Sequence, residues 1–118
     1  MLGGEPEVRH TYEIDGGKHY IRVDCETETH VIEVGLDKRS SLDSVQQADF
    51  ASWLTDKSGK VIIVDTDGYE GAIEYRIDTA ARRLGIEYET LSDEFLRRWQ
   101  MTEYFRQVRK QTLLIGRN

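Results

Sequence analysis

Cysteine is nearly absent from this sequence, since Cys25 is the one such residue among 118. A single cysteine cannot form a disulfide within the chain, and disulfides are typical of secreted proteins. We therefore expect a reducing cytoplasmic environment. Cys25 itself is expected to be a small, buried hydrophobic residue.

Long apolar runs are also missing. No stretch approaches the ~18 apolar residues that a membrane-spanning helix needs, and the start of the chain has neither the basic nor the apolar region of a secretory signal. Hydrophobic residues make up 38% of the chain and charged residues 32%, which is typical of a polar globular protein. We expect no membrane partner.

The sequence has no internal repeat, no low-complexity segment and no linker long enough to separate two domains. Its 118 residues suit a single domain with one core, spanning 1–118, in which 1–8 form a loose lead-in. The net charge of −6 argues against broad, non-specific binding to nucleic acid. It does not exclude a local basic groove or a metal site.

Two familiar functional motifs are absent. The sequence contains no glycine-rich phosphate-binding loop. His10, His19 and His30 have no spacing typical of zinc ligands, so we do not expect them to hold a metal.

Hydrophobic periodicity predicts a mixed α/β chain in the order βββ-α-β-α-β-α. Strands are predicted over about 9–14, 19–26, 30–36, 61–64 and 86–91, helices over about 42–54, 70–84 and 92–110, and a short strand or packed tail over 112–115. Turn residues at 15–18 and near 28–29 make the first three strands an antiparallel meander. Ser41 or Ser40 is expected to cap the first helix, and Gly85 to end the second. This order predicts a central mixed sheet flanked by helices.

The second and third predicted strands each carry an acidic residue among apolar ones. A period of two places Ile21, Val23 and Cys25 on one face of the second strand and Asp24 on the other. The turn between the strands pairs Asp24 with or near Glu33, with Cβ atoms about 5 Å apart. Like charges this close repel unless a cation lies between them. The pair therefore predicts a cation site, and the alternative is that both residues lie on a solvated face.

Two other charged stretches allow two interpretations each. Asp65-Thr66-Asp67-Gly68 follows the buried run 61–64, at a strand end where α/β proteins often bind ligands, although such a sequence is more often a plain turn. The predicted helix 92–110 is the most basic part of the chain. It either faces a nucleic acid or a partner, or is a solvated helix with basic residues toward its C-terminus.

An ordered combination of short motifs covers about 10–70. It consists of Arg22-Val23-Asp24-Cys25, then Ile32-Glu33-Val34, then a lysine, then a glutamine-bearing helix. This combination resembles the PD-(D/E)XK nuclease superfamily, in particular its small phage and bacterial proteins. The resemblance implies a restriction-endonuclease-like core and a metal-dependent nuclease or nuclease-like phosphodiesterase. Its partner would be nucleic acid, DNA rather than RNA, in the cytoplasm or in a phage particle.

In that superfamily an Asp on one strand and a Glu on the next hold a divalent metal. The resemblance therefore implies that Asp24 and Glu33 bind Mg²⁺ or Mn²⁺. It implies that Lys38 is the lysine that orients or activates the attacking water, and that Gln47, or less readily Gln46, is the helical glutamine. The chemistry suits these residue types, because Mg²⁺ prefers hard oxygen ligands and a lysine neutralises charge that develops in the transition state.

The sequence departs from the superfamily pattern at the lysine. That residue usually lies two positions beyond the Glu, where this chain has Gly35, and Lys38 lies five beyond it. Glu26 is an alternative to Asp24, because both side chains point the same way in the predicted strand.

Two other functions stay open. The displaced lysine, the net negative charge and the small size favour a non-catalytic assembly or interaction protein, for example in a phage particle, acting as a homo-oligomer or with a protein partner. A third alternative is a regulatory α/β module that uses Asp65 and Asp67.

Overall fold

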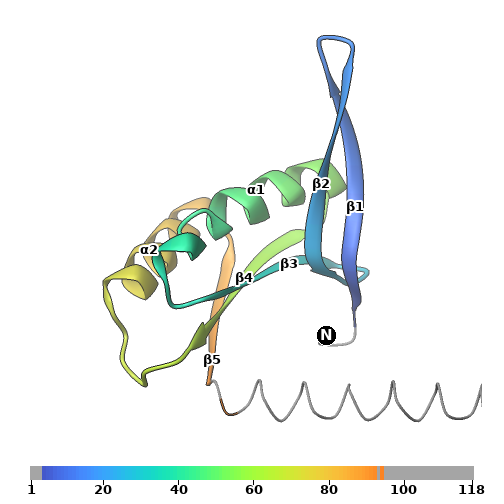
Figure 1. Ribbon diagram of the computed structural model, residues 1–118. Coiled ribbons are helices and arrows are strands. Elements are labelled where there is room, and N and C mark those ends of the chain that lie inside the picture. The colour runs from blue at the N-terminus through green and yellow to red at the C-terminus, as the bar shows by residue number, and fades with distance from the viewer. Residues whose placement is uncertain (1–3, 93, 95–118) are drawn as a thin grey trace, which may run out of the picture.

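The computed structural model describes residues 4–92 and 94 of the chain, which form a mixed α/β fold (Figure 1). The elements are β1 (Glu5–Ile14), β2 (Gly17–Glu26), β3 (His30–Leu36), the 3₁₀-helix η1 (Arg39–Ser41), α1 (Ser44–Thr55), β4 (Ser58–Asp65), α2 (Ala72–Leu84) and β5 (Glu87–Ser92). The predicted order βββ-α-β-α-β is confirmed over these residues. The predicted helix 92–110 and tail 112–115 lie outside them, apart from Ser92 and Glu94.

The strands lie side by side in the order in which the chain forms them, from β1 to β5. β2 is antiparallel to both of its neighbours, β1 and β3, whereas β3, β4 and β5 are mutually parallel. A helix connects each parallel pair, and right-handed crossovers that step in one direction place both helices on the same face. Figure 1 shows α1 and α2 over one face of the sheet.

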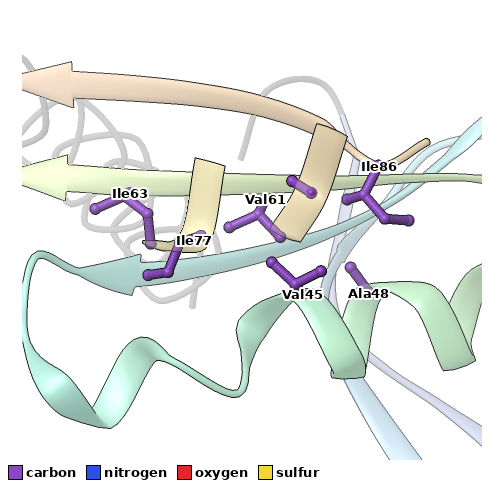
Figure 2. Packing of buried hydrophobic residues seen from close by; sticks show 7 residues of the cluster. Val45, Ala48, Val61, Ile63, Ile77 and Ile86 are labelled. Carbon is purple, nitrogen blue, oxygen red and sulfur yellow. The ribbon is translucent and has the colours of Figure 1, made fainter. Parts of the chain in front are cut away.

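The main core lies between β4 and the two helices. Val61 and Ile63 of β4 pack against Val45 and Ala48 of α1 and against Ile77 of α2 (Figure 2). All five side chains are at most 4% exposed. Burying one valine or isoleucine stabilises a fold by about 1.5–3 kcal/mol. This cluster therefore fixes both helices on the sheet, and the predicted burial of 61–64 is confirmed.

β2 changes face between Val23 and Cys25. Residues two apart in a regular strand share a face, yet Val23 packs beneath α1 with Ala51, whereas Cys25 packs with Ile62 on the opposite face. Glu7, on the paired strand at this point, has a left-handed φ of 52°. The prediction that Val23 and Cys25 share a face is therefore wrong, because a local distortion of the hairpin rotates the strand. Cys25 is buried, as predicted.

The β1–β2 hairpin, residues 5–26, projects beyond the sheet and is called the arm below (Figure 1). Its two strands pair along almost their whole length. In contrast, β2 pairs with β3 only at Cys25↔Ile32 and Glu26↔Val31. Most of the β2 edge that faces β3 is therefore free of strand pairing.

The arm has a tight tip and one aromatic contact with the helices. Asp15 and Gly16 form the tip with φ of 49° and 78°, the two positive values of a type I′ turn. Tyr12 packs edge-on against Phe50 of α1, with ring centroids 5.0 Å apart. An aromatic pair of this kind contributes about 0.5–1.5 kcal/mol beyond its buried area. This contact holds the arm beside α1.

Some predicted element ends differ from the structure. β1 begins at Glu5, so the loose lead-in predicted over 1–8 is wrong for 5–8, which enter the hairpin. Ser40 and Ser41 lie in η1, and α1 begins only at Ser44, so neither serine caps α1. Gly85 ends α2 as predicted, in a left-handed conformation with φ of 72°.

Candidate active-site cleft

A cleft of about 980 Å³ opens where the arm leaves the sheet. Its walls come from the arm, the carboxyl half of β3, η1 and the first half of α1. Asp24, Glu33 and Gln47 line this cleft, whereas Lys38 does not. The structure therefore brings together three of the four residues that the sequence suggested for one site.

Asp24 and Glu33 lie on adjacent strands at the point where strand pairing stops. Cys25↔Ile32 is the last pair on this side, which makes Asp24 and Glu33 the next opposing residues. The ladder does not continue there, and Asp24 Oδ2 instead accepts the backbone N–H of Val34 at 2.9 Å. The Glu33 carboxyl is hydrogen-bonded to Asp24. The two acidic side chains thus converge on one spot at the base of the cleft.

The surroundings of Glu33 disfavour its negative charge. Its side chain is buried, with only 5% of the residue exposed. Burial, the nearby charge of Asp24 and the hydrogen bond with Asp24 raise the pKa of Glu33 from 4.5 to about 8. Without a cation, the Glu33 carboxyl therefore carries a proton at neutral pH.

A divalent cation would remove this electrostatic penalty. Mg²⁺ commonly takes one or two carboxylates and completes its shell with water and phosphate oxygens. Among the described residues, no third histidine, cysteine or acid joins Asp24 and Glu33 in a cluster of ligands. Two carboxylates are oxygen donors of the kind that a hard divalent cation prefers.

Gly35, two residues beyond Glu33, packs closely against η1. A Cβ atom on Gly35 would lie 2.5 Å from Ser41 Oγ and 3.0 Å from Ser41 Cβ. Contacts this short do not occur without movement of the neighbouring chain. A side chain at this position would therefore require Ser41 to shift.

Lys38 lies at the N-terminal end of η1 and is exposed. Its backbone carbonyl accepts the N–H of Ser41 at 2.9 Å, which closes the 3₁₀ turn. Gln46 and Gln47, in contrast, lie on α1 and both line the cleft. The choice between the two glutamines that the sequence left open therefore stays open.

Glu26, the alternative to Asp24, lies away from the cleft. Its carboxylate accepts a hydrogen bond from Lys57 Nζ at 2.8 Å and contacts His10 Nε2. Burial raises the pKa of Glu26, but the hydrogen bonds and charges of Lys57 and His10 outweigh burial and lower it. Glu26 is therefore held in a structural ion pair, and only Asp24 of the two acids faces Glu33.

Arg22 and Tyr20 also line the cleft, and the sequence interpretation assigned them no role. A usable signal was present, because strand periodicity places both residues on the same side of the strand as Asp24. Arg22 is the one lysine or arginine among the described residues that line the cleft.

A second acidic cluster lies at the carboxyl ends of β3 and β4. Oxygen atoms of Asp37, Asp65, Asp67 and Glu74 lie within 4.8 Å of one another. The sequence suggested Asp65 and Asp67 but missed the other two. Because β3 and β4 are parallel, their carboxyl ends lie at the same edge of the sheet, and this rule brings Asp37 to Asp65.

The carboxylates of this cluster already bind the chain around them. Asp37 Oδ2 accepts the Thr66 N–H at 2.9 Å, and Asp65 Oδ1 accepts the Gly68 N–H at 3.0 Å. Glu74 Oε1 accepts the Gly71 N–H at 3.1 Å, at the start of α2. The contacts therefore account for these acids as the framework of the β4–α2 turn.

No helix among the described residues is long and apolar enough to cross a membrane. No protein-family model, curated protein or solved structure matches the chain.

Proposed function

We propose that this protein is a metal-dependent nuclease, or a nuclease-like phosphodiesterase, that hydrolyses phosphodiester bonds in nucleic acid, with DNA preferred over RNA. The observation that carries the proposal is the contact between Asp24 and Glu33 at the base of a large cleft. Their positions on consecutive strands, followed by a glutamine-bearing helix, support the proposal, because the resemblance to the PD-(D/E)XK superfamily implies acids and a glutamine in this order.

Asp24 and Glu33 are the residues that would hold Mg²⁺ or Mn²⁺. When bound, such a metal polarises the scissile phosphate and lowers the pKa of a water molecule. The Val34 N–H fixes the Asp24 carboxylate, and the arm and α1 enclose the reacting groups. Gln47 contributes an amide that can hydrogen-bond to water or phosphate. Lys38, outside the cleft lining, has the weakest support of the four proposed residues.

The test is cleavage of labelled DNA by the purified protein with Mg²⁺ or Mn²⁺. We expect metal-dependent cleavage that falls by about 100-fold or more in Asp24→Asn and in Glu33→Gln, since each loses a charged ligand. Glu33→Gln is close in shape to the protonated Glu33 side chain, so it tests the charge with little change in packing. Cleavage that survives unchanged in both variants would contradict the assignment.

Asp67→Asn is the matched control, because Asp67 is an exposed acid in the other acidic cluster. It changes the net charge by the same amount as Asp24→Asn. We expect its cleavage rate to equal that of the unmodified protein.

The second candidate function is a non-catalytic assembly or interaction protein, for example of a phage particle. Gly35 at the lysine position and the absence of Lys38 from the cleft lining favour it. Calorimetry separates the two functions. A protein that binds no Mg²⁺ or Mn²⁺, does not cleave DNA and forms a defined homo-oligomer would support the assembly function instead.

A further inference from the structure

The wall that the arm contributes to the cleft carries an accessible aromatic ring. Tyr20 lines the cleft and is 56% exposed. The guanidinium carbon of Arg9 lies 4.9 Å from the centroid of the Tyr20 ring. This cation–π contact covers part of the ring and orients it. The remaining surface can stack on a flat, uncharged group.

The cleft has little positive charge with which to hold a phosphate backbone. Arg22 supplies its one lysine or arginine side chain among the described residues, beside the acids Asp24 and Glu33. The whole chain carries a net charge of −6. A protein that grips duplex DNA through many phosphates uses several basic contacts, each of which adds to the salt dependence of binding. This cleft is not built in that way.

Aromatic stacking offers a different source of affinity. In proteins that bind single strands, bases stack on aromatic side chains, because every base that is not paired in a helix can present a flat face. A volume of about 980 Å³ is at the upper end of the range for small-molecule sites, which suits a few unpaired nucleotides better than a double helix.

We propose that the cleft takes an unpaired nucleic-acid strand, with one base stacked on Tyr20 and a neighbouring phosphate bound by Arg22. Arg22, Asp24 and Glu33 all line this cleft, so a phosphate bound by Arg22 lies in the same cleft as the acidic pair. Gln46 and Ser40 on the facing wall provide donors and acceptors for base edges. The inference rests on the proposed nuclease function for its reaction, but the recognition of the strand can be measured without cleavage.

The experiment measures the binding of labelled single-stranded and duplex oligonucleotides of the same sequence by fluorescence anisotropy. Binding is measured in EDTA and again with Ca²⁺, under conditions in which the oligonucleotides stay intact. We expect the single strand to bind at least about tenfold more tightly than the duplex. Tyr20→Ala should weaken single-strand binding roughly 5- to 150-fold, and Tyr20→Phe should restore it, since the stacking face is retained.

Two exposed residues on α2 serve as matched controls. Tyr75 is 65% exposed and Arg83 is also exposed, and neither lines the cleft. Tyr75→Ala and Arg83→Gln should leave binding unchanged. Arg22→Gln should reduce the slope of log affinity against log salt by about 0.7, the value for one lost phosphate contact with a single strand. Thermal unfolding of each variant shows whether the fold is retained.

The outcomes separate this inference from the proposed function. Equal binding of duplex and single strand, or equal effects of Tyr20→Ala and Tyr75→Ala, would overturn the inference even if the protein cleaves DNA. Tyr20-dependent binding of the single strand without metal-dependent cleavage would support the inference and count against the nuclease. The same anisotropy measurement with an RNA oligonucleotide of the same sequence shows whether the cleft prefers ribose or deoxyribose.

Discussion

Asp24 joins β2 to β3 through two side-chain hydrogen bonds, one to the Val34 amide at 2.9 Å and one to the Glu33 carboxyl. Both contacts replace the strand pairing that ends at the neighbouring residue. The bond with Glu33 needs a proton at the interface between two acids. The metal-free fold therefore favours a protonated Glu33, whereas a bound metal requires Glu33 to lose this proton.

The first prediction concerns stability and pH. The pKa of Glu33 rises on folding from 4.5 to about 8 because of burial and of Asp24. The stability that its protonated form contributes is therefore fully present below about pH 4.5 and is lost as pH rises through 8. The slope is at most about 1.4 kcal/mol per pH unit. Urea unfolding across this range should show the loss, and Glu33→Gln should remove it.

Glu13→Gln is the control, because Glu13 is an exposed carboxyl on β1. Its pH profile should match that of the unmodified protein. A Glu33→Gln profile as steep as the original would show that Glu33 does not titrate in this window.

The second prediction concerns metal affinity. Metal ligands must be deprotonated, so binding of Mn²⁺ at Asp24 and Glu33 releases the proton that Glu33 carries. Affinity should rise up to about tenfold per pH unit between pH 6 and 8, and level off above the Glu33 pKa of about 8. Calorimetry in two buffers with different ionisation enthalpies measures this proton release. An affinity that is constant from pH 6 to 8 would contradict the prediction.

The third prediction concerns Gly35. An added Cβ would lie 2.5 Å from Ser41 Oγ, so Gly35→Ala should destabilise the fold by about 1–3 kcal/mol. Ser41→Gly removes the obstructing atoms, so the double variant should lose less stability than the sum of the single changes. A double-mutant cycle in urea measures this coupling. If the stability losses of the two single variants simply add up, η1 moves away from the added Cβ atom without cost.

The fourth prediction concerns the ion pair at the base of the arm. Burial opposes the charge of Glu26, but its hydrogen bonds with Lys57 and His10 lower its pKa below 4.5. Its stabilising effect is therefore present above about pH 4.5 and is lost as pH falls through the lowered pKa. Glu26→Gln should cost about 1.5–3 kcal/mol at pH 7 and much less at acid pH. A cost that is independent of pH would mean that the charge is irrelevant.

The fifth prediction concerns the second acidic cluster. Asp37 accepts hydrogen bonds from the Thr66 backbone and hydroxyl, so Asp37→Ala should destabilise the fold by about 1 kcal/mol. Because the cluster holds a turn, the number of Mn²⁺ ions bound per chain should not change. A lower stoichiometry in Asp37→Ala would make this cluster a metal site.

Local patterns in the sequence predicted the contact between Asp24 and Glu33. Two alternating strands and a short turn restrict the register to a few residues, and this local geometry is sufficient to make the two acids opposing residues. The same pattern did not predict the change of face at Val23, because regular alternation assumes an undistorted strand and Glu7 on the paired strand is left-handed.

The position of Lys38 depended on structure that periodicity does not encode. The predicted helix start near residue 42 is instead a 3₁₀ turn that packs Ser41 onto Gly35. Arg22 differs, since its place on the Asp24 side of the strand was visible in the sequence. The family pattern drew attention to a lysine and away from this arginine.

Strand pairing joins the arm to β3 at only two residue pairs, and this has a consequence for variation in the fold. Adding one residue to each strand near the tip would lengthen the hairpin by about 3.4 Å, far from the packing of Val61 and Ile63 against the helices. The length of the arm can therefore change without affecting the stability of the core. Insertions at Asp15 and Gly16 would alter which molecules fit beside the cleft while the rest of the chain stays as it is.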